Sequence, residues 1–284
     1  MKTLSELKLL AQGGQADIYI IDENKVIRVL RNADEGDYLK MEFSVMEILK
    51  SKGKPVPKVY ECVEIEGRPA IIMERLYGDS MLDFIKKNPI KLFQQGKQLA
   101  KLHIETSELV DDFNIVSINK RAASLIPMAD LLDDELKAFV LKILEQLPLK
   151  NHICHGDFHP GNIIWSKDKY VVIDWFGVTI GDKMSDIAHT YLLLRNTPKL
   201  PHISWIEKII MGCSGKLISR KYLFAIKKLY DFDWGDFSKW MIVRASERVF
   251  YGMPSEKEEL INYIKTCKNA YEQGIEPSKW WKYI

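Results

Sequence analysis

The chain has 284 residues and a net charge of +2, with 46% hydrophobic and 28% charged residues. This balance is ordinary for a soluble globular protein and argues against a dedicated nucleic-acid binder. No apolar run approaches the roughly 20 residues that a membrane-spanning helix needs, and the segment MKTLSELKLLAQGG is too short and too interrupted for a secretion signal. We therefore expect a cytoplasmic protein, monomeric or homodimeric, that binds neither nucleic acid nor a membrane.

The four cysteines favour the same compartment, because none of them forms a CxxC pair. Cys62, Cys154, Cys213 and Cys267 are scattered along the chain, as is typical of thiols in a reducing cytosol. We therefore expect all four to be free.

The first part of the chain predicts a small antiparallel sheet with one helix. Residues 16–22 and 25–31 are β-branched runs separated by DEN, which is a hairpin signal. Residues 36–53 place apolar side chains at helical spacing and end on a glycine, which indicates an amphipathic helix. Residues 58–76 return to strands with EGR as their turn, and we expect one more strand before the segment KLLAQGG.

The rest of the chain has a mostly helical pattern. Residues 90–109 carry an apolar stripe, and helical patterns resume at 133–147 and dominate from residue 184 onward. Between them, the apolar runs NIIW and YVVID predict a short hairpin with polar residues at its ends. We therefore predict an α+β fold, with a β lobe at residues 1–75 and a mostly helical lobe at residues 76–284.

Polar residues crowd into CHGDFHPGNIIW, residues 154–165, and allow three chemical interpretations. His155, Asp157 and His159 alternate as H-x-D-x-H, a spacing that zinc and iron sites use. However, the following Pro-Gly pair makes the segment a loop, and the chain has neither an HExxH motif nor a further histidine cluster. A serine hydrolase is disfavoured because the chain has no G-x-S-x-G elbow.

The third interpretation, phosphoryl transfer, explains more of these residues. A kinase needs an acid beside the attacking hydroxyl and oxygen ligands that hold Mg²⁺ on the phosphates. Asp157 and Asn162 have the D-x-x-x-x-N spacing of a kinase catalytic loop, and the predicted hairpin then delivers Asp174 at the end of VVID. The order and spacing of these three residues favour a phosphotransferase.

The stretch HGDFHPGNIIW…VVIDWFGVTIGDKMSDIA resembles the signature of the aminoglycoside phosphotransferase and choline kinase family. LAKLH at 99–103 resembles the helix before that family's catalytic loop, and IIMERLYGDSM at 71–81 resembles its hinge. The resemblance implies a two-lobed protein-kinase-like fold. It also implies that the γ-phosphate of ATP or GTP is transferred, with Mg²⁺, to a hydroxyl of a small molecule.

The resemblance assigns roles within the signature stretch. It implies that Asp157 is the catalytic base or the acid that orients the acceptor hydroxyl, and that Asn162 and Asp174 bind Mg²⁺. We expect His155 to have a structural hydrogen-bonding role. Asp186, within GDKMSDIA, is expected to anchor the catalytic loop through backbone N–H groups.

The resemblance also implies nucleotide-binding residues in the β lobe. Gly13 and Gly14 stand where a glycine-rich loop should cover the phosphates, and adjacent glycines let backbone N–H groups approach an anion. In the hinge segment, Glu74 is expected to present a carbonyl and Leu76 an amide to the nucleotide base, with Met73 at the back of the pocket.

A strand cation is expected on the phosphates, and Arg28 aligns with it in place of the usual lysine. Arginine is always charged and can bridge two oxygens, so it suits this position. Lys25 and Arg31 are poorer candidates, because they point to the opposite face of the strand. Glu42 best matches the partner acid on the helix.

The acceptor stays open at this level. Basic residues outnumber acidic ones in residues 190–284, but YDFDWGDF at 230–237 forms a local acidic cluster. Five tryptophans could build a cage for a quaternary ammonium or a planar ring, or could simply pack the helices. They are Trp205, Trp234, Trp240, Trp280 and Trp281. Antibiotic, choline-like and thiamine-like acceptors all fit.

Two other classes of function also stay open. A catalytically weak regulatory protein that binds a nucleotide would account for an arginine in place of the usual lysine. A protein kinase is disfavoured, because residues 174–177 are DWFG instead of DFG and no A-P-E segment follows. The short span to Asp186 also leaves no room for a long activation loop.

Overall fold

Two compact units make up the chain. The computed structural model describes residues 3–110, 115–195 and 205–284. The first unit consists of Met1–Lys87 and Pro160–Val178, and the second consists of Asn88–His159 and Thr179–Ile284. The helices within the described ranges are too short or too polar to cross a bilayer.

The strands described in the first unit include one five-stranded antiparallel sheet with the order β1-β2-β3-β5-β4. The strands are β1 (Lys8–Gln12), β2 (Ala16–Ile20), β3 (Lys25–Leu30), β4 (Val59–Ile65) and β5 (Arg68–Glu74). The hairpins expected around DEN and EGR are confirmed. The extra strand was expected before KLLAQGG. Instead, β1 is formed by the first five residues of that segment, because the chain turns at the two glycines that follow.

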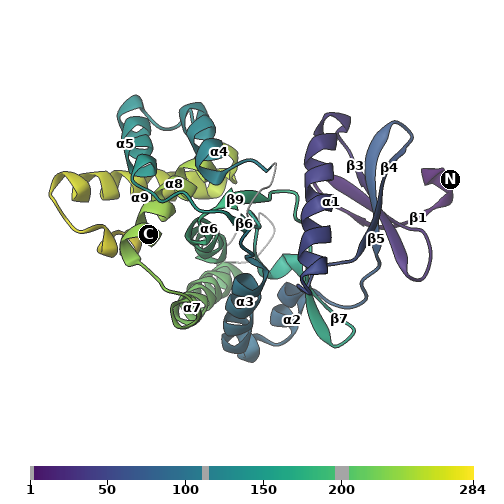
Figure 1. Ribbon diagram of the computed structural model, residues 1–284. Coiled ribbons are helices and arrows are strands. Elements are labelled where there is room, and N and C mark those ends of the chain that lie inside the picture. The colour runs from purple at the N-terminus through teal and green to yellow at the C-terminus, as the bar shows by residue number, and fades with distance from the viewer. Residues whose placement is uncertain (1–2, 111–114, 196–204) are drawn as a thin grey trace. The chain divides into compact units, whose positions relative to one another are not determined.

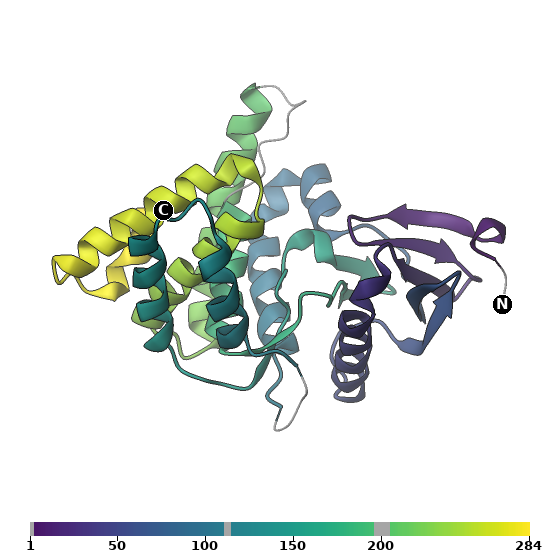
Figure 2. The same ribbon diagram turned by 90° about the horizontal axis from the view of Figure 1, so that it is seen from above.

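Helix α1 (Gly36–Ser51) packs on one face of this sheet, as Figures 1 and 2 show. The alternation of β3 explains the two faces, because successive strand residues point to opposite sides. Ile27 and Val29 are buried on one side against Leu4 of a short N-terminal 3₁₀ helix. Arg28, which alternates with them, points to the side of α1, where it contacts Glu42.

A second hairpin, β7 (Ile163–Ser166) with β8 (Lys169–Val172), belongs to the first unit although the sequence division groups it with the helical lobe. The Trp165 amide donates to the Asp79 carbonyl at 3.0 Å, and the Val172 amide donates to the Pro55 carbonyl at 2.7 Å. Helix α2 (Met81–Lys87) follows this junction. The functional division of the chain at residues 75 and 76 stays a prediction.

One glycine makes the junction possible. Gly78 has φ +129°, and a Cβ at this position would lie 2.1 Å from the Trp165 carbonyl oxygen. Only a residue without a side chain allows the two backbones to come this close. The segment after β5 is thereby bonded to the hairpin that carries Asn162 and Asp174 at its ends.

The second unit is mostly helical. Its helices are α3 (Leu92–Thr106), α4 (Ile118–Leu125), α5 (Asp134–Glu145), α6 (Lys183–Arg195), α7 (Trp205–Leu229), α8 (Trp234–Tyr251) and α9 (Pro254–Glu272). Helix α3 packs along α7, and α6 packs along α8 (Figure 1). The helices predicted at 90–109 and 133–147 are confirmed as α3 and α5. Helix α4 and the short pair β6 (His152–Cys154) with β9 (Thr179–Gly181) were not predicted.

Candidate active site

The turn after β8 presents Asp174 in an unusual backbone conformation. Asp174 has φ +64°, a left-handed conformation that aspartate tolerates better than most residues. The next residue, Trp175, is fully buried, and its ring N–H donates to the Val172 carbonyl at 3.1 Å. The Val178 amide closes the turn by donating to the Trp175 carbonyl at 3.1 Å. Burial of the indole thus fixes the turn, while 39% of the Asp174 side chain stays exposed.

Asn162 and Asp174 lie at the same end of the β7–β8 hairpin. Ile163 pairs with Val172 in the hairpin register, and the Ile173 amide donates to the Asn162 carbonyl at 2.9 Å. An amide oxygen and a carboxylate are hard oxygen donors of the kind that Mg²⁺ prefers. The donor set therefore fits the metal that the family resemblance implies.

Arg28 joins two carboxylates inside the first unit. Its Nη1 lies 2.6 Å from Glu42 Oε2, and its Nη2 lies 3.2 Å from Asp174 Oδ1. The pairing of Arg28 with Glu42 that the sequence predicted is confirmed. A lysine has only one nitrogen, whereas the guanidinium reaches each acid with a different one. Its guanidinium also lies 5.6 Å from the centre of the Phe176 ring.

The Glu42 carboxylate is 1% exposed, so its charge state depends on these neighbours. Burial raises the pKa of Glu42 to about 7 against the opposing charge of Arg28, and the Asp174 carboxylate adds to the rise. The Trp175 backbone also hydrogen-bonds Glu42. Helix α1 and the turn that carries Asp174 are thus connected through one buried acid.

The two other strand cations are engaged elsewhere. Arg31 Nη2 lies 2.6 Å from Asp17 Oδ1, and this hydrogen bond holds the pKa of Asp17 below its ordinary value of 3.8. Lys25 lies over the Tyr60 ring at 4.8 Å. Of the three, Arg28 is the cation that contacts Glu42 and Asp174. That it binds the phosphates stays a prediction.

Gly13 and Gly14 form the turn between β1 and β2. The Gly13 amide donates to the Ala16 carbonyl at 2.9 Å, and a Cβ on Gly13 would lie 3.2 Å from the same oxygen. A Cβ on Gly14 would meet nothing within 4 Å. Gly13 therefore closes the turn and Gly14 leaves its surroundings open; that they cover phosphates stays a prediction.

The hinge residues follow β5. Met73 is buried, and the Glu74 amide donates to the Lys58 carbonyl at 2.7 Å. That Glu74 and Leu76 bind the nucleotide base stays a prediction. The Glu74 carboxylate accepts a hydrogen bond from Lys167 at 3.1 Å, which ties the hinge to the hairpin turn.

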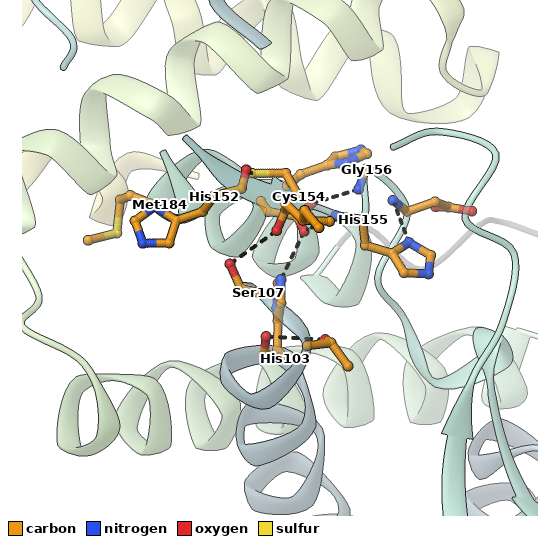
Figure 3. Close-up of polar contacts among 12 residues, drawn as sticks. His103, Ser107, His152, Cys154, His155, Gly156 and Met184 are labelled. Atoms are coloured by element: carbon orange, nitrogen blue, oxygen red, sulfur yellow. Dashed lines mark hydrogen bonds and ion pairs between the residues drawn. The ribbon is translucent and has the colours of Figure 1, made fainter. Parts of the chain in front are cut away.

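In the second unit, Asp186 of α6 holds the loop that precedes Asp157. Its Oδ2 accepts the His155 amide at 2.6 Å and its Oδ1 accepts the Gly156 amide at 2.9 Å. The same Oδ2 lies 3.0 Å from His103 Nε2 of α3, and Figure 3 shows His103 pointing toward the labelled loop residues. The anchoring role predicted for Asp186 is confirmed.

The charge of Asp186 is stabilised although the side chain is fully buried. Burial by itself would raise the pKa of Asp186. The hydrogen bond from His103 and the charges of His103, His155 and Arg244 outweigh burial and hold the pKa well below its ordinary value of 3.8. Asp186 is therefore ionised at neutral pH and can accept all three hydrogen bonds.

Asp157 itself is accessible, with 46% of its side chain exposed. Its amide donates to His155 Nδ1 at 3.2 Å, so His155 has the structural role that was expected. His159 Nε2 lies 3.5 Å from Asp157 Oδ2. The H-x-D-x-H residues form no metal-binding group of three or more, and no other such group occurs in the described part of the chain.

Comparison with known proteins decides between the chemical interpretations. The sequence model of the phosphotransferase enzyme family matches residues 6–207. The chain belongs to this family. It is therefore a small-molecule phosphotransferase, and the suspected resemblance is confirmed. No curated protein matches the sequence of this phosphotransferase.

Solved structures show the fold that this phosphotransferase shares. Aminoglycoside phosphotransferase APH(4)-Ia superposes with a TM-score of 0.60 at 17% identity, over 96% of this chain and 94% of that one. The amicoumacin kinase hAmiN superposes with a TM-score of 0.60 at 14% identity, over 97% of this chain and 90% of that one. Aminoglycoside 2'-phosphotransferase-IIIa superposes with a TM-score of 0.58 at 17% identity, over 92% of this chain and 90% of that one. The predicted protein-kinase-like α+β fold is confirmed.

The five tryptophans do not form one cage. Trp240 and Trp280 are fully buried and pack the helical core. Trp234 and Trp281 stack on each other, with ring centres 4.8 Å apart and planes at 19°. Trp205 lies outside the residues whose side chains the structure describes. The packing alternative is therefore correct for Trp240 and Trp280, while Trp234 and Trp281 stay half-buried.

Proposed function

We propose that the chain transfers the γ-phosphate of a nucleoside triphosphate, ATP or GTP, to a hydroxyl of a small molecule in the cytoplasm. The observation that carries this proposal is the bridge from Arg28 to Glu42 and Asp174. A buried cation beside an exposed strand-end carboxylate provides what a metal-bound triphosphate requires, namely one positive charge and one oxygen ligand. The family match supports the same chemistry.

The residues of the first unit would bind the nucleotide. Gly13 and Gly14 would let the turn between β1 and β2 approach the phosphates without a side chain in the way, and Arg28 would offer its guanidinium. Asn162 and Asp174 would hold Mg²⁺. When bound, the metal neutralises charge on the phosphate oxygens. The hinge, with Met73, Glu74 and Leu76, would receive the base.

Asp157 would act on the acceptor hydroxyl. In phosphoryl transfer there is little covalent chemistry for a protein to perform, so the carboxylate contributes chiefly by positioning the hydroxyl and receiving its proton late. The loop before Asp157 is anchored to α6 through two backbone amides, which limits how far the carboxylate can move. This anchoring supports a role in positioning.

The acceptor class is open among related chemistries. Structural relatives were solved with ADP and hygromycin B, with GDP, and with AMP-PNP, Ca²⁺ and amicoumacin. We infer a polyhydroxylated or amine-bearing acceptor, of the antibiotic, choline-like or thiamine-like kind.

An ATP- and GTP-consumption screen over aminoglycosides, macrolides, choline, ethanolamine, thiamine, homoserine and methylthioribose tests the proposal. We expect turnover with at least one acceptor, and loss of that turnover in Asp157→Ala. Tight nucleotide binding without turnover on any acceptor would favour the regulatory alternative that Arg28 leaves open. Absence of Mg²⁺-dependent nucleotide binding would reject both.

A further inference from the structure

Tyr222 of α7 is fully buried where this helix packs along α3. Its hydroxyl oxygen lies 2.6 Å from His103 Nδ1. The two helices come close together here, because a Cβ at Gly96 would lie only 3.3 Å from the Tyr222 amide nitrogen. Gly96 and His103 lie about two helical turns apart on the same face of α3. Tyr222 lies beyond residues 6–207, which the family model matches, and no motif in the sequence pointed to it.

The Tyr222 hydroxyl is the partner of the ring nitrogen that does not contact Asp186. The Asp186 carboxylate is ionised and can only accept, so His103 Nε2, which lies 3.0 Å from Asp186 Oδ2, carries a proton. In a neutral ring, Nδ1 is then the acceptor and the hydroxyl donates to it. In a charged ring, Nδ1 also carries a proton and the hydroxyl oxygen accepts it. Tyr222 can therefore hold the ring in either protonation state.

The His103 ring is connected to the loop on both sides of Asp157. On the N-terminal side, Asp186 makes the connection, because its carboxylate also accepts the amides of the two preceding loop residues at 2.6 Å and 2.9 Å. On the C-terminal side, the fully buried Phe158 stacks on the His103 ring, with ring centres 4.1 Å apart and planes at 18°. The orientation of one imidazole therefore affects the backbone before and after Asp157.

Burial makes the Tyr222 hydroxyl hard to replace. His103 is 1% exposed and Tyr222 is 0% exposed, so bulk water does not reach Nδ1. A buried polar atom that loses its partner is unfavourable. Without the hydroxyl, we expect the ring to tilt toward another partner and its contacts with Asp186 and Phe158 to change.

We propose that Tyr222 is a positioning residue for phosphoryl transfer, which acts through the His103 ring on the loop that carries Asp157. The proposal rests on the proposed role of Asp157. Tyr222 fixes the orientation of the ring, and the ring holds Phe158 by stacking and Asp186 by a hydrogen bond. These contacts limit the directions in which the Asp157 carboxylate can leave the loop.

Two matched substitutions separate this role from general packing. Tyr222→Phe removes the hydroxyl and keeps the ring, so the volume of the side chain is nearly unchanged. Tyr263→Phe removes the same group from a tyrosine that is also buried. Tyr263 belongs to α9, which carries none of the residues that hold the loop.

Amide hydrogen exchange of the peptide that spans residues 154–159 measures how firmly the loop is held. We expect faster exchange in Tyr222→Phe than in the wild type or in Tyr263→Phe. With an acceptor from the screen, kcat should fall about 10-fold in Tyr222→Phe, which is less than the roughly 100-fold loss that a misplacement of about 1 Å can cause. The KM for the nucleotide should stay unchanged, because its proposed binding residues belong to the first unit.

A double variant tests whether the hydroxyl acts through the ring. Residues in one hydrogen-bond network have non-additive effects. The kcat of the double variant Tyr222→Phe with His103→Gln should therefore equal that of His103→Gln alone. If the two losses in kcat multiply instead, Tyr222 acts by another route and the proposal is wrong.

Exchange or kcat in Tyr222→Phe equal to that in Tyr263→Phe would also overturn the proposal. A wild-type protein that fails to bind a nucleotide with Mg²⁺ would instead reject the proposed function. The exchange measurement does not depend on activity, so the two failures are distinguishable.

Discussion

Replacing Asp186 by asparagine should destabilise the helical unit, because a single amide cannot replace the acceptors of the carboxylate. Oδ2 accepts from the His155 amide and lies beside His103, while Oδ1 accepts from the Gly156 amide. An asparagine has one acceptor oxygen, and its N–H₂ group must face a donor whichever way it is turned. At least one buried N–H is left without an acceptor, which lowers the free energy of unfolding by about 1–3 kcal/mol.

The loss of a buried charge adds to this figure. Breaking a buried, hydrogen-bonded charge pair typically destabilises by about 3–5 kcal/mol, which is a large part of the roughly 5–15 kcal/mol by which proteins are stable. With a urea dependence of about 2–3 kcal/mol/M, the unfolding midpoint should fall by about 1–2 M. The fluorescence of the buried Trp240 and Trp280 reports on the same unit.

The pH dependence gives a second readout of the same substitution. The pKa of Asp186 is lowered in the folded state, so the unfolded chain takes up the proton first as the pH falls. The stability that the ionised carboxylate contributes is present above pH 3.8 and is lost progressively below it. The difference in free energy of unfolding between the wild type and Asp186→Asn should therefore have its full size at pH 5 and become smaller at pH 3.

A charge-matched control separates burial from net charge. Asp37 has a 94% exposed side chain and forms an ion pair with the exposed Lys40, so Asp37→Asn should change the free energy of unfolding by less than about 0.5 kcal/mol. The anchoring argument is wrong if Asp186→Asn unfolds at the same urea concentration as Asp37→Asn. It is also wrong if the free energy of unfolding of Asp186→Asn falls between pH 5 and pH 3 as steeply as that of the wild type.

Three further substitutions test the first unit and the acceptor chemistry. Asp157→Ala should lower kcat by about 10²- to 10⁴-fold while thermal unfolding is unchanged; wild-type turnover would contradict its role. Asp174→Ala should abolish Mg²⁺-dependent ATP affinity in calorimetry, and an unchanged affinity would exclude it as a ligand. Gly78→Ala should cost about 3 kcal/mol or more in urea unfolding, since its Cβ would lie 2.1 Å from the Trp165 carbonyl oxygen. Gly14→Ala, whose Cβ meets nothing within 4 Å, is the matched control and should unfold as wild type does.

Local patterns predicted the part of the site that depends on one element at a time. Strand alternation was enough to select Arg28 over Lys25 and Arg31, because it depends only on the period of the strand. Helical spacing placed Glu42 on α1, and the loop spacing placed Asp157 before Asn162. Each of these predictions uses residues that lie close together in the sequence.

Contacts between distant segments could not be predicted in this way. The hairpin that carries Asp174 packs beside the segment after β5, more than 80 residues earlier, through hydrogen bonds of the backbone that no side-chain pattern records. The chain of hydrogen bonds from Tyr222 through His103 to Asp186 also joins separate helices, and a single tyrosine in a helix is typical of a packed position. The short pair of β6 and β9 has too few residues to show alternation.

The arginine at position 28 can be explained by the two acids that it joins. The Glu42 carboxylate is buried and tends toward protonation, whereas the Asp174 carboxylate is partly exposed. A lysine placed to pair with Glu42 would leave Asp174 without a cation, because one ammonium cannot take the positions of two guanidinium nitrogens 2.6 Å and 3.2 Å from separate acids. The departure from the usual lysine therefore preserves the expected charge and adds a second contact, which argues for an active enzyme over a regulatory protein that has lost its strand cation.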